Sequence, residues 1–136
     1  MPAGVDPLGP NNILGFLTGP LTGTPAVIGS RFVAVAKSPK TGGWGDANCG
    51  GFFGPHLKFA GFDGVLFSGI AHEPVYLLID EGEAELRDAS DLWGLGVTPL
   101  EDALKERHGE DVEIASIGPA GERLSLMAAI MNDKER

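Results

Sequence analysis

The stretch "TGGWGDANCGGFFG", residues 41–54, constrains this chain more than any other part of it, because six of its fourteen residues are glycine. Clustered glycines reach positive φ angles and lack a Cβ, so consecutive backbone N–H groups can converge on an anion such as a phosphate. The segment is neither a Walker A motif nor a G-x-G-x-x-G that follows a strand. Two interpretations stay open, a mobile loop with tight turns or a ligand-binding loop. Trp44, Asn48, Phe52 and Phe53 favour the second, since flexible linkers are rich in Gly and Ser without large aromatics.

The size and composition of the chain predict one globular domain over residues 1–136. At this length the chain can bury roughly two-thirds of the surface that its unfolded form exposes. Its hydrophobic share of 43% and charged share of 21% are ordinary for a folded protein, which argues against disorder and against a coiled coil.

The charge balance and the single cysteine exclude several classes of function. Because 19 acidic residues outnumber 10 basic ones, the chain is not expected to bind nucleic acid through its overall field. Cys49 alone forms no internal disulfide and offers no thiolate cluster for an iron–sulfur or zinc site. The N-terminus lacks the basic and apolar regions of a signal peptide, and no apolar run approaches the roughly 20 residues that span a bilayer. We expect a cytoplasmic protein that binds neither nucleic acid nor membranes.

Short apolar runs bounded by Gly, Pro, Ser and Thr predict the strands. The last three runs before residue 90 follow one another closely, with a turn at Glu81 and Gly82, and therefore indicate a meander with one solvated face. The predicted strands cover residues 13–18, 31–36, 64–69, 74–80, 83–88, 112–118 and 124–131.

Two helices are predicted between these strands. A short helix lies within residues 50–61, where Pro55 fits the first turn and Gly61 can end it. A longer helix begins at the capping box of residues 98–101 and ends at Gly109. Because the strands outnumber the helices and do not alternate with them, the fold class is α+β with mixed or antiparallel sheets.

A short internal sequence similarity, which we call the internal echo, predicts two pseudo-symmetric halves. The runs "ILGFLTGPLTG" and "VEIASIGPAG" each go from a strand to Gly-Pro and then to another Gly, and a further apolar run follows each. Similar strand and turn units often pack about a pseudo-twofold axis, although so short a match also fits chance.

The other residues with reactive or charged side chains can each be interpreted in a structural or a functional way. Arg31 opens an apolar strand, where its guanidinium can offer a bidentate fork to a phosphate or simply face solvent. Cys49 is either a small residue in a crowded turn or a reactive thiol, and Asp46 is either a turn acceptor or a ligand. No catalytic role is assigned to His56, His72 or His108, and the acidic series Asp80, Glu81, Glu83, Glu85 and Asp88 is expected to form a solvated face rather than a metal site.

Eight blocks in order resemble one known family over essentially the whole chain. They are "VDPLGPNN", "TGPLTGT", "GSRFVAVAKSP", "WGDANCGGFFGPHLKFAGFDGV", "EPVYLLI", "RDASDLWG", "IASIGPAGE" and "AAIMND". This set is similar to the N-terminal domain of the aldehyde ferredoxin oxidoreductase family, tungsten–pterin enzymes.

The resemblance implies an enzyme that oxidises aldehydes to carboxylic acids and passes the electrons to ferredoxin. Its tungsten, or molybdenum in some relatives, is held by two pterin dithiolenes, and an iron–sulfur cluster bound by other domains relays the electrons. The N-terminal domain forms the base under the bis-pterin. Arg31, Asn48 and Gly50 match family positions that contact the pterin, and we include their neighbours Cys49 and Gly51 in the expected cofactor-binding site. No catalytic or metal-ligating residue is expected in this chain.

The resemblance also implies a truncated domain. Family members begin earlier and continue past "AAIMND" into a second glycine-rich stretch and helical domains, so we expect a fragment that is inactive alone, with the remaining domains as partners. Exposed apolar surface on such a fragment favours self-association. The alternative is a noncatalytic assembly or scaffold module that keeps the fold without the cofactor.

Overall fold

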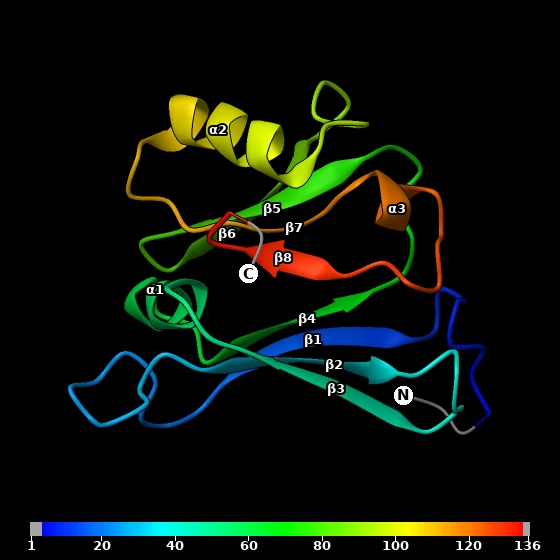
Figure 1. Ribbon diagram of the computed structural model, residues 1–136, viewed down its shortest axis with the longest axis horizontal. Helices are drawn as coiled ribbons and strands as arrows, with labels where there is room; N and C mark the ends of the chain where they lie inside the picture. Colours follow the sequence, from blue (N-terminus) through cyan, green and yellow to red (C-terminus); the bar gives the residue numbers. More distant parts are fainter. Residues whose placement is uncertain (1–3, 135–136) are drawn as a thin grey trace.

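The computed structural model describes residues 4–134 as two stacked layers, which confirms the α+β class (Figure 1). The lower layer is a four-stranded antiparallel sheet in the order β3-β2-β1-β4. The upper layer holds the antiparallel pairs β5–β6 and β7–β8, with α2 above them. The strands are β1 Ile13–Thr18, β2 Phe32–Lys37, β3 Trp44–Cys49, β4 Gly64–Ser68, β5 Val75–Asp80, β6 Glu83–Asp88, β7 Ala115–Ile117 and β8 Ile130–Asn132. The helices are α1 Phe53–Phe59, α2 Val97–His108 and α3 Pro119–Glu122.

Six of the fourteen residues of the glycine-rich segment form a strand, which the sequence did not predict. β3 runs from Trp44 to Cys49 as an edge strand and pairs with β2 in an unbroken register, from Lys37 opposite Trp44 to Phe32 opposite Cys49. Gly, Asp and Asn have low strand propensity, but backbone pairing with a neighbouring strand overrides that propensity. The glycines therefore lie in a sheet edge and its two flanking turns.

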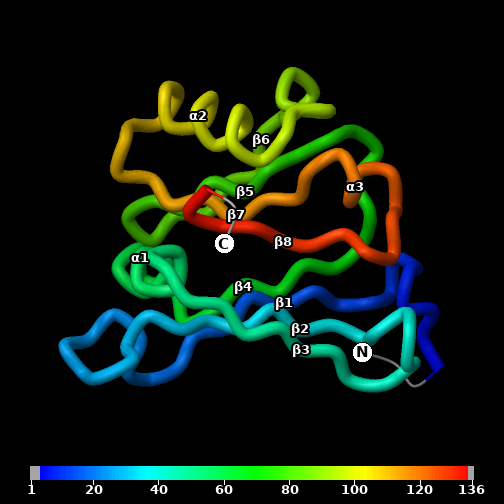
Figure 2. The backbone as a smooth tube through the Cα atoms, viewed as in Figure 1, coloured from blue at the N-terminus to red at the C-terminus, as the bar shows by residue number. Residues whose placement is uncertain are grey.

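The predicted meander is only partly correct. β5 and β6 form the expected hairpin, whose turn residues Glu81 and Gly82 both have positive φ, at 44° and 86°. This is the backbone geometry that matches the twist of a two-residue hairpin. β4 leaves the meander and pairs instead with β1 in the lower sheet, with Leu66 opposite Gly15. The segment between β4 and β5 thus crosses from one layer to the other (Figure 2).

Both predicted helices are present, with one difference at a start. α1 has Pro55 in its first turn and ends before Gly61, which adopts φ 94°. α2 ends at Gly109 as expected. It begins at Val97, so its N-cap is Gly96 rather than the predicted Thr98, and Gly96 makes no side-chain cap bond. No helix within residues 4–134 is long and apolar enough to cross a membrane.

The C-terminal strands are much shorter than predicted. β7 and β8 cover three residues each, and α3 interrupts the connection between them. Leu124, Leu126 and Met127 are exposed, and Leu124 has a φ of 57°. Apolar character in this stretch therefore does not mark a paired strand. The two Gly-Pro units of the internal echo, β1 to β2 and β7 to β8, both form antiparallel pairs joined by long connections; a twofold relation between the halves stays a prediction.

The core of the lower layer is a cluster of four phenylalanines. The ring centroid of Phe32 lies 6.2 Å from that of Phe16 and 4.9 Å from that of Phe53, which opens α1. Phe67 of β4 meets Phe16 edge-to-face at 5.9 Å. These contacts place α1 against the end of the sheet next to the glycine-rich turn after β3.

Replacement of Phe32 by alanine tests this core. Phe32 is 3% exposed, so Phe32→Ala leaves a cavity and is expected to lower the free energy of unfolding by about 3–5 kcal/mol. The matched control is Phe59→Ala, which removes a ring that is 69% exposed and should cost less than about 0.5 kcal/mol. Denaturant titration of both variants measures the difference, and equal losses would contradict the assignment of the core.

Candidate functional site

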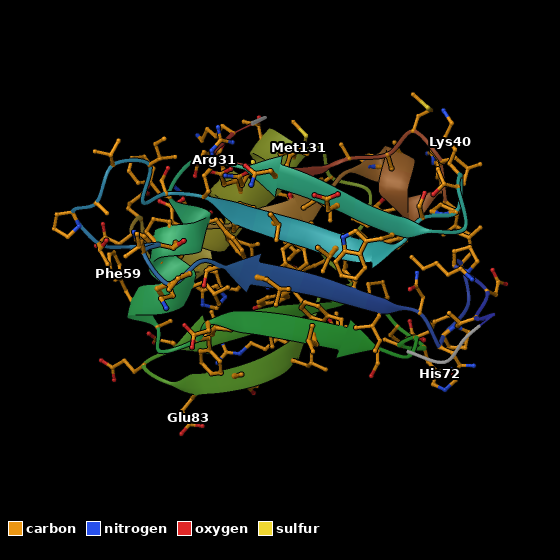
Figure 3. The ribbon with its side chains drawn as sticks, turned by 90° about the horizontal axis from the view of Figure 1, so that it is seen from below. Arg31, Lys40, Phe59, His72, Glu83 and Met131 are labelled. Atoms are coloured by element: carbon orange, nitrogen blue, oxygen red, sulfur yellow. The ribbon has the colours of Figure 1, made fainter. Side chains whose placement is uncertain are left out.

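The alternation of side chains along β3 separates its last two residues onto opposite faces of the sheet. Asn48 lies opposite Val33 and shares the outer face of the lower sheet. Cys49 lies opposite Phe32 and faces inward, toward the upper layer. Figure 3 views the molecule from below, onto the outer face, and shows Arg31 beside the end of β3. Arg31 immediately precedes β2, so strand pairing alone brings it next to Asn48.

Arg31 and Asn48 form the polar part of the candidate site. The guanidinium Nη1 of Arg31 donates a hydrogen bond of 2.9 Å to Oδ1 of Asn48. A guanidinium carries five N–H donors, and this contact uses one of them. Gly50 lies against the same guanidinium, since a Cβ built on Gly50 would stand 3.9 Å from the Cζ atom of Arg31. Three of the five expected site residues therefore meet at the end of the sheet.

A groove of about 440 Å³ opens beside this pair. One wall is the end of the sheet, with Leu17 and Val33, and the other is the connection between β1 and β2. On that connection Ile28 is exposed and holds φ 65°, a strained conformation for a β-branched residue. We call this the outer groove; its lining also includes Thr18, Gly19, Pro20, Leu21, Thr22, Val27, Phe32, Arg31 and Asn48. An apolar surface with convergent polar groups at one end is the usual form of a small-molecule site.

The other two expected site residues point elsewhere. Cys49 Sγ donates to Oδ1 of Asn132 at 2.9 Å, on the inner side of the sheet. Gly51 has φ 91°, and a Cβ there would lie 1.7 Å from Oδ2 of Asp133. The missing Cβ of Gly51 therefore makes room for another part of the chain. The cofactor contacts of all five residues stay predictions.

A second hollow, of about 630 Å³, lies between the two layers. Apolar side chains such as Phe16, Val65 and Leu104 dominate its lining. Residues of both layers line it, and neither Arg31 nor Asn48 is among them.

The other sequence candidates lie apart from the outer groove. His108 forms a 3.0 Å hydrogen bond with the Tyr76 hydroxyl, and its pKa is lowered by burial and by the charges of Arg87 and Arg107. Asp46 is exposed on the outer face, two residues before Asn48. Within residues 4–134, no three His, Cys, Asp or Glu side chains gather closely enough to hold a metal ion.

One carboxyl group with unusual titration was not singled out from the sequence. The pKa of Glu113 is raised to about 7, first by burial and then by its hydrogen bond to Asp133 and the charge of that residue. Glu101 raises the pKa further, whereas Lys105 lowers it. Nothing in the local pattern around Glu113 marks it, because its partner is twenty positions away and only the fold brings the two together.

Comparison with known proteins gives one consistent result. Residues 1–136 match the family model described as aldehyde ferredoxin oxidoreductase, N-terminal domain. The chain is 53% identical over 133 residues to a tungsten-containing aldehyde ferredoxin oxidoreductase of Pyrococcus abyssi, covering 97% of the chain and 22% of that protein. It is 39% identical to the WOR-like subunit of an aliphatic sulfonate oxidoreductase of Pyrococcus furiosus, covering 93% and 22%.

A solved structure agrees with these relatives. The active-site complex BamBC of benzoyl coenzyme A reductase, determined with 1,5-dienoyl-CoA, superimposes with a TM-score of 0.91 at 39% identity. The match covers 94% of this chain and 20% of that one. The chain thus spans about a fifth of the length of the proteins that it resembles.

Substitution of Glu113 tests the raised pKa of its carboxyl group. Because its folded pKa is about 7 instead of the ordinary 4.5, the folded state holds more protons than the unfolded state between these pH values. The contribution to stability is therefore fully present below pH 4.5 and is lost as the pH rises to about 7. We expect the melting temperature of the native chain, relative to that of Glu113→Gln, to fall across this window. The exposed Glu83→Gln serves as the control, and a difference that does not change with pH would contradict the assignment.

Proposed function

Because this chain belongs to the aldehyde ferredoxin oxidoreductase family, as its N-terminal domain, we propose that its outer groove binds the pterin part of a tungsten or molybdenum cofactor. Arg31 would hold a pterin phosphate, and Asn48 and the backbone at Gly50 would hold the edge of the pterin ring. When bound, the cofactor supplies a redox-active metal for the oxidation of an aldehyde to a carboxylic acid.

The main support for the proposal is that Arg31, Asn48 and Gly50 lie together at one end of an apolar groove. A planar guanidinium can give two parallel charge-assisted bonds to a phosphate. An amide both donates and accepts, as the edge of a pterin ring requires. Gly50 lets the backbone lie close to the ligand, and the apolar residues Leu17 and Val33 offer a flat surface for a ring. The donor set present therefore fits the group.

The reaction itself belongs to the whole enzyme in this proposal. The chain covers 22% of its tungsten-containing relatives, so the substrate pocket, the iron–sulfur cluster and the ferredoxin surface are assigned to other domains. The chain alone is then inactive. The relatives are named for an aldehyde, a sulfonate and benzoyl coenzyme A, which supports a shared cofactor base with substrate selection in other domains.

Substitution of Arg31 tests the proposal in a full-length relative whose matching segment is replaced by residues 1–136. Arg31→Lys keeps the charge but loses the planar fork, and one hydrogen bond to a charged group contributes about 1.5–3 kcal/mol. We expect a roughly ten- to hundredfold loss in cofactor retention under a competing chelator. Pterin fluorescence after oxidation and tungsten content per chain measure the effect. The exposed Arg123→Lys, on the opposite layer, is the matched control.

Two outcomes would reject the cofactor role of Arg31. Unchanged pterin and tungsten content in Arg31→Lys would rule out the proposed contact between Arg31 and a pterin phosphate. A chimera that folds and assembles but contains neither pterin nor metal with native Arg31 would favour the scaffold module instead. Melting temperatures of the variants establish that any loss of cofactor is not a loss of fold.

We also expect the 136-residue chain to associate with itself. Large apolar side chains are exposed on several elements, among them Trp44 at 68%, Leu66 at 66% and Met127 at 91%. Exposed apolar surface of this kind marks interaction sites or aggregation. Sedimentation velocity across micromolar concentrations should show a rising weight-average mass, and a monomer at all concentrations would contradict the expectation.

A further inference from the structure

Asn132, at the end of β8, bonds to the end of β3 through both the oxygen and the nitrogen of its side-chain amide. It is 1% exposed, and Oδ1 accepts from Cys49 Sγ at 2.9 Å while Nδ2 donates to the Gly50 carbonyl at 3.0 Å. One side chain thus satisfies a donor and an acceptor on consecutive residues that lie more than eighty positions away in the chain.

Asp133 continues the same contact one step further along the turn. Its Oδ2 accepts the backbone N–H of Phe52 at 3.0 Å. Gly51 lies between these bonds, and any Cβ there would overlap Asp133 Oδ2 at 1.7 Å and approach Asn132 Nδ2 at 2.7 Å. Asp133 itself adopts φ 45°, a conformation for which Asp is among the better suited residues. The two segments therefore fit closely only with glycine at 51.

These contacts act on the residues that form the outer groove. Asn48 and Cys49 are adjacent in β3, so a bond that holds Cys49 inward also sets the direction in which Asn48 points outward. The Gly50 carbonyl accepts a hydrogen bond from Asn132 Nδ2 on one side, and Gly50 lies against the Arg31 guanidinium on the other. Movement of the 49–52 turn would carry Asn48 and Gly50 with it.

We propose that Asn132 and Asp133 are positioning residues that clamp the 49–52 turn. The clamp orients Asn48, which lines the outer groove, and Gly50, which lies against Arg31 beside it. The cofactor part of this inference rests on the function proposed above. The clamp itself does not, because it is made of contacts within the chain. It gives the block "AAIMND" a role at a site far from it in sequence.

Loss of the clamp should open the turn locally and leave the sheet intact. Asn132 and Asp133 together supply three hydrogen bonds to the turn, whereas β3 keeps its pairing with β2. Local opening exposes backbone amides to exchange without global unfolding. Cys49 is the single cysteine of the chain, so its thiol reports the same opening to a soluble disulfide reagent.

The first experiment uses the 136-residue chain and the variants Asn132→Ala, Asp133→Ala and Asp133→Asn. We expect amide exchange at Gly50, Gly51 and Phe52, and thiol reaction of Cys49, to accelerate about tenfold or more in both alanine variants. Exchange in β1 should stay unchanged. Asp133→Asn retains an oxygen that accepts from Phe52 and should restore most of the protection. The control Asp102→Ala removes the partner of the neighbouring Lys134 without touching the turn.

The outcomes separate the clamp from a general effect on stability. Unchanged exchange at residues 50–52 in Asp133→Ala, or equal acceleration in β1, would overturn the clamp. Asp133 is partly exposed, so its alanine variant keeps the test decisive even where Asn132→Ala fails to fold.

The second experiment measures pterin and tungsten content in the full-length chimera. Asp133→Ala should reduce both, and Asp133→Asn should restore them. If Arg31→Lys loses the cofactor while Asp133→Ala keeps it, the positioning role is overturned and the proposed function stands. If neither variant loses the cofactor, both the proposed function and the cofactor role of the clamp are overturned. Whether the clamp itself exists is decided only by the exchange rates of the first experiment.

Discussion

The side-chain amide of Asn132 joins the last strand of the upper layer to the edge strand of the lower layer. It is almost fully buried, and it bonds across the layers to both Cys49 and Gly50. A buried amide that loses its partners costs about 1–3 kcal/mol per unsatisfied group, so the upper layer has one preferred position over the end of β3. Asp133 repeats the constraint at Phe52. The outer groove is shaped by contacts made on the other side of the sheet.

Alternate side chains of the edge strand β3 point to opposite faces of the sheet, so those that pack in the interior are separated from those on the outer face. Inward side chains at this end of the sheet meet the phenylalanine cluster and the upper layer, as Phe32 and Cys49 do. Outward ones, such as Asn48, line the outer groove. An edge strand suits this division because only one of its sides needs a partner strand, and its turn can approach other elements. Low strand propensity is then tolerated, and glycine is required only where a backbone or carboxylate comes close.

The family relationship and the geometry address different levels of function. Family membership is established by the match over the whole chain, and it places tungsten chemistry among the relatives. The geometry concerns only what this domain contributes, which is a groove with one guanidinium, one amide and a closely approaching backbone. Relatives named for different substrates retain the same domain at 39% identity and a TM-score of 0.91. The function proposed above, a cofactor-binding base with substrate selection in other domains, is consistent with both observations.

The sequence alone determined the elements whose signals are local. Periodic apolar runs gave β1, β2 and the β5–β6 hairpin, and Pro55, Gly61 and Gly109 marked helix ends correctly. Resemblance of short blocks was enough to select Arg31, Asn48 and Gly50, which the fold does bring together.

Only the tertiary structure decided what depends on distant partners. β3 exists because β2 pairs with it, and β4 joins β1 instead of β5, neither of which local propensity encodes. Gly51 is glycine because Asp133 occupies the space of its Cβ. The pKa of Glu113 is raised because burial and that same carboxylate disfavour its charged form. These cases have one physical reason. Steric and electrostatic interactions act between residues that are close in space but far apart in the sequence, so local sequence patterns do not reveal them.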